Sequence, residues 1–136
     1  METVTKTRKQ ILLVDNEPRV AISLARGLRA LGDGYQIETA FSSDIAISML
    51  EEMDYHLLII DYDMPKRDGL DLVALLAFIS PNTKVILMTA NGTPALQQRA
   101  QAAGVDGYLE KPFTLDKLRD MIRELLELTT RQKVLP

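Results

Sequence analysis

The chain contains no cysteine and only one histidine among its 136 residues. The absence of cysteine excludes disulfide bonds, thiolate nucleophiles and cysteine-ligated zinc, and a single histidine cannot by itself build a histidine-rich metal site. That histidine, His56, stands at the start of an apolar stretch, so we expect it to be structural. Any chemistry must therefore come from carboxylates, hydroxyls and lysine.

Long hydrophobic runs and a strong basic charge are also missing. No apolar run approaches the roughly 18 residues needed to span a bilayer, and the N-terminal METVTKTRKQ lacks the apolar segment of a secretory signal. We therefore expect a cytoplasmic protein without a membrane partner. A net charge of −3 gives no electrostatic footprint for nucleic acid, so direct binding to nucleic acid is not expected.

The composition is that of one globular domain, with 46% hydrophobic and 26% charged residues. No internal repeat, low-complexity tract or shift in composition marks a second domain. We expect residues 1–9 to be a disordered N-terminal arm, residues 10–128 to form the domain, and residues 129–136 to be a tail or the start of a linker.

Apolar stretches of strand length alternate with longer helical patterns. Five strands are predicted, at residues 10–15, 35–40, 56–61, 83–89 and 105–110. Apolar residues recur at helical spacing in three of the intervening segments: Val20, Leu24, Leu28 and Leu31; Ile45, Met49 and Leu50; and Leu72, Leu75, Leu76 and Ile79. Further helices are expected from about Thr93 to Ala103, stopped by Gly104, and from an N-cap at Thr114 to about Leu128. This alternation predicts a doubly wound α/β fold, a parallel five-stranded sheet with helices on both faces.

Polar residues follow four of the predicted strands, at the edge where ligands bind in open parallel sheets. Asp15 ends the first strand, Asp61 ends the third with Asp63 just beyond, Thr89 ends the fourth, and the fifth runs into Lys111. Carboxylates gathered at one point repel one another and invite a hard cation such as Mg²⁺. An aspartate beside a metal ion, a lysine and a hydroxyl has what it needs to accept a phosphoryl group.

Four segments resemble the successive motifs of one known family. They are ILLVDNEP, LLIIDYDMPKRDGLDL, VILMTA and GVDGYLEKPF, and they occur in the family's order. The chain resembles the response regulator receiver domains of two-component signalling systems, in particular the chemotaxis regulators. The resemblance covers about residues 10–128 and implies a flavodoxin-like sheet with strand order 2-1-3-4-5.

The resemblance assigns a role to each residue of the metal site. It implies that Asp61 is the phosphoacceptor, and that Asp15 and Asn16 form the acidic-pocket pair that binds Mg²⁺. The main-chain carbonyl of Asp63 is a further implied metal ligand. The family usually has two acids where this chain has Asp15 and Asn16, so the expected Mg²⁺ affinity is lower.

It also assigns roles around the phosphoryl group and at the output surface. Thr89 and Lys111 are implied to contact the phosphoryl oxygens, Tyr108 matches the switch aromatic, and the bond between Lys111 and Pro112 is expected to be cis. The implied partner is a sensor histidine kinase or a phosphorelay protein. Signal output is expected through the fourth helix, fifth strand and fifth helix, and the resemblance allows a homodimer on phosphorylation. The resemblance implies a signalling phosphoacceptor that assists its own phosphotransfer and autodephosphorylation, and not an enzyme with a separate substrate.

Three alternatives remain open at this point. A phosphorylation-independent pseudo-receiver would explain Asn16, although Asp61, Thr89 and Lys111 are all retained. A phosphohydrolase of the haloacid dehalogenase class would explain the D-x-D spacing of Asp61 and Asp63, but that class places this motif on the first strand. A flavodoxin-like FMN protein is the weakest, because DNEP follows the first strand where a Ser/Thr/Gly-rich phosphate loop would be needed.

Overall fold

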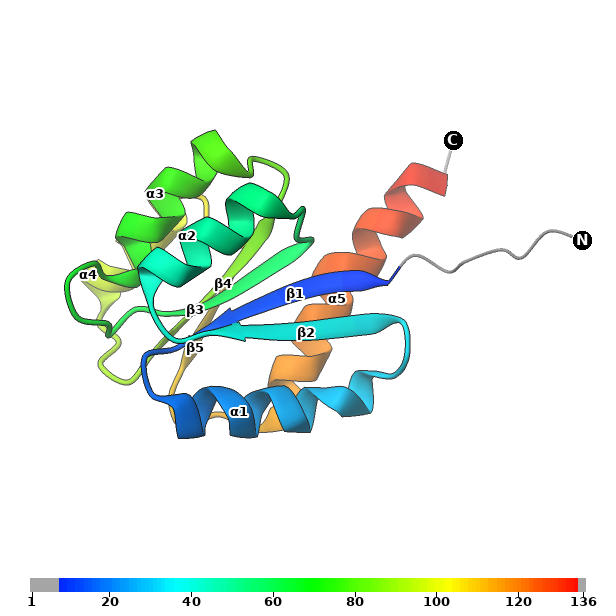
Figure 1. Ribbon diagram of the computed structural model, residues 1–136, viewed down its shortest axis with the longest axis horizontal. Helices are drawn as coiled ribbons and strands as arrows, with labels where there is room; N and C mark the ends of the chain where they lie inside the picture. Colours follow the sequence, from blue (N-terminus) through cyan, green and yellow to red (C-terminus); the bar gives the residue numbers. More distant parts are fainter. Residues whose placement is uncertain (1–7, 135–136) are drawn as a thin grey trace, which may run out of the picture.

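Figure 1 shows an open, twisted sheet with helices packed on both of its faces. The computed structural model describes residues 8–134, with side chains as far as residue 127. The strands are β1 (Lys9–Val14), β2 (Tyr35–Ala40), β3 (Leu57–Asp61), β4 (Lys84–Thr89) and β5 (Gly107–Glu110). The helices are α1 (Pro18–Gly27), a 3-10 turn η1 (Leu28–Leu31), α2 (Ser43–Glu52), α3 (Gly69–Ile79), α4 (Pro94–Ala102) and α5 (Leu115–Val134).

The sheet has the topology that the resemblance implied. Its strands lie in the order β2-β1-β3-β4-β5, and every neighbouring pair is parallel. The chain steps from β1 to β2 on one side and then crosses back to β3 on the other. The carboxyl ends of β1 and β3 therefore flank the point where the strand order reverses, which is where ligands bind in such sheets.

Two apolar layers enclose the sheet. Helices α2, α3 and α4 cover one face, and α1 and α5 cover the other (Figure 1). Alternate residues of β1 enter the two layers: Leu12 and Val14 pack toward α2 and α3, while Ile11 and Leu13 pack toward α1 and α5. All five residues of β3 are buried, as expected of a central strand covered on both faces.

Side chains at the helix starts fix the loops at the carboxyl edge of the sheet. The hydroxyls of Ser42, Thr93 and Thr114 each accept a hydrogen bond from the backbone N–H three residues later, at 3.2, 3.0 and 3.1 Å. At the other end of α4, Gly104 takes a φ of +90°, which side-chain-bearing residues rarely adopt. The predicted N-cap at Thr114 and the predicted stop at Gly104 are confirmed.

Two apolar residues predicted to face the core lie at the surface. Leu75 in α3 is 37% exposed and Ile45 in α2 is 54% exposed. In α3 the side facing the sheet is filled by Leu72 and Leu76, which are four residues apart, and Leu75 lies beside that row. In α2 the buried row passes through Leu50, and Ile45 lies outside it.

The ends of the domain also differ from the expectation. Helix α5 continues to Val134, beyond the predicted end at about Leu128, because residues 129–134 contain neither glycine nor proline to stop it. Lys9 belongs to β1 and not to an arm, and residues 1–7 and 135–136 lie outside the described residues. Within the part that is described, no helix is both long and apolar enough to cross a membrane.

Candidate functional site

The register of the strands brings the predicted site residues together. Val14 on β1 is paired with Ile60 on β3, so the next residues along, Asp15 and Asp61, emerge side by side at the carboxyl edge. On the other side of β3, the backbone N–H of Lys111 donates to the carbonyl of Thr89 at 2.8 Å, which holds the end of β5 beside the end of β4.

Two buried carboxylates face one lysine. Asp15 is 0% exposed and Asp61 is 3% exposed. One oxygen of each, Oδ1, accepts the backbone N–H two residues later, from Glu17 at 2.9 Å and from Asp63 at 3.0 Å. The other oxygens, Oδ2, lie 3.6 Å and 3.3 Å from Nζ of Lys111, respectively. A single cation therefore offsets two buried negative charges.

The pKa of Asp15 reflects the presence of two buried carboxylates beside one lysine. Burial raises the pKa of Asp15 above its ordinary value, and the nearby charge of Asp61 raises it further, while the N–H of Glu17 and the cation of Lys111 lower it in part. Its Oδ2 is buried and accepts no hydrogen bond from the described residues. A buried carboxylate oxygen without a donor is costly, so this atom is available to a cation.

The donor set at this edge suits a hard divalent ion. Among residues 8–134 no group of three or more His, Asp or Glu side chains is arranged to hold a metal. Asp15 and Asp61 offer two carboxylates, and the main-chain carbonyl of Asp63 accepts no hydrogen bond from the described residues. Mg²⁺ commonly takes one or two carboxylates and keeps several waters, so these residues fit it.

Thr89 is tied to Asp63 in a way that the sequence did not predict. Thr89 is fully buried, and its hydroxyl donates to Oδ2 of Asp63 at 3.1 Å while accepting from the N–H of Asn91 at 3.1 Å. The N–H of Ala90 donates to the same carboxylate oxygen at 3.0 Å. The side chain of Asp63 thus joins the loop after β3 to the loop after β4. The D-x-D spacing was the only signal in the sequence, and it does not reveal the rotamer.

Asn16 lies on the outer side of the site. It is half-buried and lines a hollow of about 440 Å³. The opposite walls come from the start of α2 and the loop after β3, and the other lining residues are Phe41, Ser42, Ser43, Asp44, Met64, Pro65, Lys66 and Arg67. Its side chain makes no hydrogen bond to Asp15 or Asp61, so its role as a metal ligand stays a prediction.

Tyr108 packs under the loop that follows Thr89. Its hydroxyl is buried and has no hydrogen-bond partner within the described part of the chain. A Cβ added to Gly92 would lie 2.8 Å from this hydroxyl and 2.6 Å from Cδ of Glu110, so the loop sits directly on both side chains. Burial raises the pKa of the Tyr108 phenol, and the charges of Glu110 and Asp63 add to the shift.

The peptide bond between Lys111 and Pro112 is cis, as predicted. The structure therefore brings Asp15, Asp61, Asp63, Thr89 and Lys111 to one edge of the sheet, with Tyr108 close behind them.

The sequence matches the response regulator receiver domain family over residues 11–123. It is 35% identical over 116 residues to a probable chemotaxis protein CheY of Rhizobium etli, covering 83% of this chain and 88% of that protein. It is also 33% identical to the response regulator protein PmrA of Pseudomonas aeruginosa, covering 89% of this chain. The chain spans only 54% of the length of PmrA, and 45% of the transcriptional regulatory protein TcrA of Mycobacterium tuberculosis.

Solved structures share the fold. A CheY-like receiver domain protein of Methanospirillum hungatei superposes with a TM-score of 0.85 at 25% identity, covering 93% of this chain and 99% of that one. The response regulator TrrA of Thermotoga maritima, solved in complex with Mg²⁺ and beryllium fluoride, superposes with a TM-score of 0.75 at 30% identity, covering 87% and 99%.

Proposed function

The chain belongs to the response regulator receiver domain family, and from that premise we propose that it is a phosphorylation-controlled signalling switch. Its phosphoryl group would come from a sensor histidine kinase or a phosphorelay protein and would be carried by Asp61. The observation that carries the proposal is the pair of buried carboxylates, Asp15 and Asp61, which among the described residues are opposed by Lys111 alone, with one carboxylate oxygen that has no hydrogen-bond donor there.

In the proposed reaction, a carboxylate oxygen of Asp61 attacks phosphorus as the P–N bond to the donor histidine breaks. The imidazole leaves with the electron pair of that bond and takes up a proton. Lys111, 3.3 Å from Oδ2 of Asp61, is placed to neutralise charge on the phosphoryl oxygens. Water entering from the hollow beside Asn16 would hydrolyse the acyl phosphate and reset the switch.

Asp15, Asp61 and the Asp63 carbonyl would hold Mg²⁺, with the Asn16 amide oxygen as a weaker fourth donor. When bound, the ion would neutralise the charge that develops on the transferred group. The Mg²⁺ and beryllium fluoride complex of TrrA supports the assignment of this metal, since that relative is 30% identical.

The output would begin at Thr89. Its hydroxyl now donates to Asp63, and a phosphoryl group on Asp61 offers it a competing acceptor of higher charge. If Thr89 changes partner, the loop through Gly92 moves, and the buried hydroxyl of Tyr108 beneath it is released. The surface of α4, β5 and α5 would then change, and with it binding of an output partner or phosphorylation-dependent dimerisation. Phosphorylation must favour the new arrangement by about 1 to 3 kcal/mol to act as a switch.

Intact-mass analysis tests the proposal. The full chain is incubated with a small acyl phosphate and Mg²⁺, and we expect a mass gain of one phosphoryl group. The gain should not appear when a chelator removes Mg²⁺ before the phosphodonor is added. Asp61→Ala should abolish the gain, whereas Asp54→Ala, an exposed carboxylate at the opposite end of the sheet, should not. Undiminished labelling of Asp61→Ala would refute the assignment.

A phosphorylation-independent interaction module is the second candidate, favoured by Asn16 in place of the usual acid. The same experiment separates the two, because a pseudo-receiver would show no mass gain with either a small phosphodonor or a phosphorylated kinase domain.

A further inference from the structure

One oxygen of the Asp63 side chain accepts two hydrogen bonds from the start of the next loop. Its Oδ2 lies 3.1 Å from the hydroxyl of Thr89 and 3.0 Å from the backbone nitrogen of Ala90. Thr89 is fully buried, whereas Asp63 is exposed. Two donors that converge on one charged oxygen form a pocket for an anion, and here the protein's own carboxylate fills it.

This pocket lies beside the proposed phosphoacceptor. The backbone N–H of Asp63 donates to Oδ1 of Asp61 at 3.0 Å, which holds the two residues together at the end of β3. In the sheet, Asp61 is paired with Met88, the residue that precedes Thr89 on β4. A phosphoryl group carried by Asp61 would therefore enter the region where the two donors meet the Asp63 carboxylate.

The loop after β4 depends on the same contact. The Thr89 hydroxyl also accepts the N–H of Asn91 at 3.1 Å, so one hydroxyl links Asp63 to Asn91. Burial is the main cause of the raised pKa of the Tyr108 phenol, and the charge of Asp63 contributes to it. The Asp63 carboxylate is therefore near the Tyr108 hydroxyl that Gly92 covers, and its position is felt along this loop.

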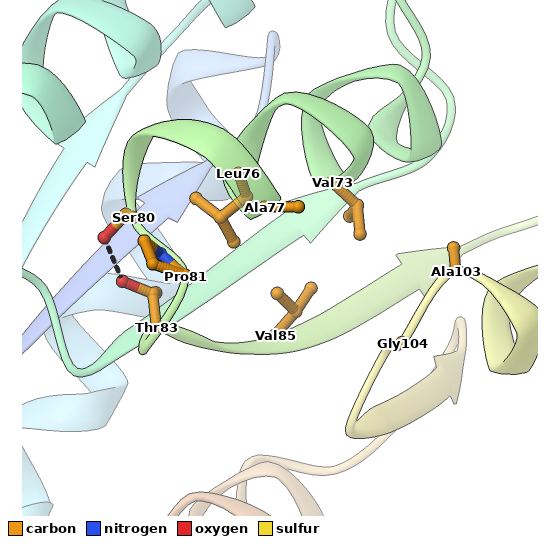
Figure 2. Close-up of a pocket in the computed structure, with 9 residues that line it drawn as sticks. All are labelled: Val73, Leu76, Ala77, Ser80, Pro81, Thr83, Val85, Ala103 and Gly104. Carbon is orange, nitrogen blue, oxygen red and sulfur yellow. Dashed lines mark hydrogen bonds between the residues drawn. The ribbon is translucent and has the colours of Figure 1, made fainter.

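The threonine at the other end of the same strand is held differently. The hydroxyl of Thr83 donates to the carbonyl of Tyr55 and pairs with the hydroxyl of Ser80, as Figure 2 shows. These partners are neutral, and losing the contact would leave a buried carbonyl unpaired. The Asp63 carboxylate is exposed, so water can solvate it when it is released. The contact at Thr89 can therefore change its acceptor at little cost, whereas the contact at Thr83 cannot.

We propose that the Asp63 carboxylate is an internal competitor of the phosphoryl group, which occupies the Thr89 and Ala90 donors in the resting protein and is displaced when Asp61 is phosphorylated. This inference rests on the proposed function. A competitor within the protein lowers the apparent affinity of the donors for another anion, by the fraction of time that it leaves them free. Asp63 therefore sets the threshold of the switch. It acts through Thr89 and Ala90 and forms no bond to phosphorus, so it is a positioning residue.

Amide spectra of the full chain without ligand test the resting contact. In Asp63→Ala, the Ala90 amide proton should move upfield and exchange with solvent faster, because its charged acceptor is gone. The Lys111 amide, which donates to the Thr89 carbonyl at 2.8 Å, should keep its position because the strand ends stay intact. An unchanged Ala90 amide overturns the proposal. Loss of the Lys111 bond also overturns it, because Asp63 would then maintain the fold and not compete for donors.

Beryllium fluoride, an anion that mimics a phosphoryl group on a carboxylate, tests the competition at saturating Mg²⁺. We expect Asp63→Ala to lower its dissociation constant by about tenfold. Asp63→Asn should lower it by about threefold, because the amide oxygen still accepts hydrogen bonds but carries no charge. Asp44→Asn is the matched control for charge, since Asp44 is an exposed carboxylate on the hollow beside Asn16. It should change the constant by less than about twofold.

A double-mutant cycle separates competition for the donors from a general effect of charge. In a Thr89→Val background, Asp63→Ala should improve beryllium fluoride binding by only about threefold, because the hydroxyl that it would release is already absent. In a Thr83→Val background the improvement should stay at about tenfold, since Thr83 lies at the other end of β4. Equal improvements in the two backgrounds would mean that Asp63 acts by its charge alone, which contradicts the proposal.

Failure of the proposed function gives a different result from failure of this inference. A wild-type protein that neither binds beryllium fluoride nor gains a phosphoryl group on Asp61 refutes the switch, and the inference falls with it. A wild-type protein that binds beryllium fluoride with an affinity that Asp63→Ala leaves unchanged refutes the internal competitor alone.

Discussion

The two ends of the sheet differ in how far their buried polar groups are paired. At the amino end, Nδ1 of His56 accepts the backbone N–H of Gln10 at 2.9 Å, while the backbone N–H of His56 donates to the carbonyl of Gln10 at 2.8 Å. The hydroxyls of Thr83 and Ser80 are paired there as well. At the carboxyl end, two carboxylates are buried against one lysine, and Oδ2 of Asp15 has no hydrogen-bond donor among the described residues.

The amino end is not perfectly satisfied, since Oε1 of Gln10 also lacks a partner among the described residues. That atom belongs to a neutral amide, however, whereas the unpartnered oxygen at the carboxyl end belongs to a carboxylate whose burial costs far more. Under the proposed function, the amino end stabilises the fold, and the carboxyl end gives up stability to keep the proposed metal and phosphoryl site ready. Removing a compensating group should therefore destabilise the protein at either end, whereas neutralising a buried charge at the carboxyl end should stabilise it.

The largest effect is expected from removing the shared cation. Lys111→Met leaves Asp15 and Asp61 facing each other without compensation, and should lower the free energy of unfolding by about 2 kcal/mol. This is less than for a fully buried pair, because the lysine side chain is 26% exposed. Adding Mg²⁺ should restore part of the loss, since a ligand that binds only the folded state stabilises it. Urea unfolding with and without Mg²⁺ checks both points, and exposed Lys117→Met is the control.

A smaller loss is expected at the amino end. Thr83→Val removes the hydroxyl that donates to the carbonyl of Tyr55 and should cost about 1.5 kcal/mol, because that carbonyl becomes unpaired. Mg²⁺ should not reverse this loss, and phosphorylation of Asp61 should proceed at the wild-type rate. A change in phosphorylation rate would mean that the two ends are not independent.

A gain in stability is expected from neutralising Asp15. Asp15→Asn removes a buried charge while Lys111 keeps Asp61 as its partner, so the free energy of unfolding should rise by about 1 kcal/mol at neutral pH. The pKa of Asp15 is raised in the folded protein, so the wild type loses stability as pH rises from the ordinary value of 3.8 through the folded pKa. The advantage of the variant should therefore be small in acid and complete above that range. Thermal unfolding across pH measures it, and a destabilised Asp15→Asn at neutral pH contradicts the account.

The smallest effect is expected at Asn16. Asn16→Asp should tighten Mg²⁺ binding by about threefold, or about 0.7 kcal/mol, and speed phosphorylation of Asp61. The gain is partial because the added carboxylate attracts the ion but also repels the two acids already present. Mg²⁺ titrations of both forms decide the matter. Equal or weaker affinity in the variant would place Asn16 away from the metal.

The sequence predicted the central strands well because a strand buried on both faces appears in the sequence as a continuous apolar run. The segment predicted at residues 56–61 became β3 at Leu57–Asp61, in which every residue is buried, and the order of strand ends placed Asp15, Asp61, Thr89 and Lys111 at one edge. Helical periodicity was less reliable, because it could not tell which side of an all-apolar helix meets the sheet. Leu75 was expected to be buried for that reason, and it lies at the surface.

Contacts that depend on side-chain rotamers could not be predicted from the sequence. The bond from Thr89 to Asp63 depends on which way two side chains turn, and either could have faced Asp61 instead. The end of α5 was placed too early because residues 129–136 were interpreted as a tail or the start of a linker, yet the helix continues to Val134.

The most direct test of the central claim is to locate the phosphoryl group on the chain. After treatment with a phosphodonor and Mg²⁺, borohydride reduces an acyl phosphate to an alcohol, which marks the modified residue for peptide mass analysis. The account predicts homoserine in place of Asp61 and at no other position, in an amount that falls when Mg²⁺ is withheld. A mark on Asp15 or Asp63, or no mark on a protein that binds Mg²⁺ normally, would contradict it.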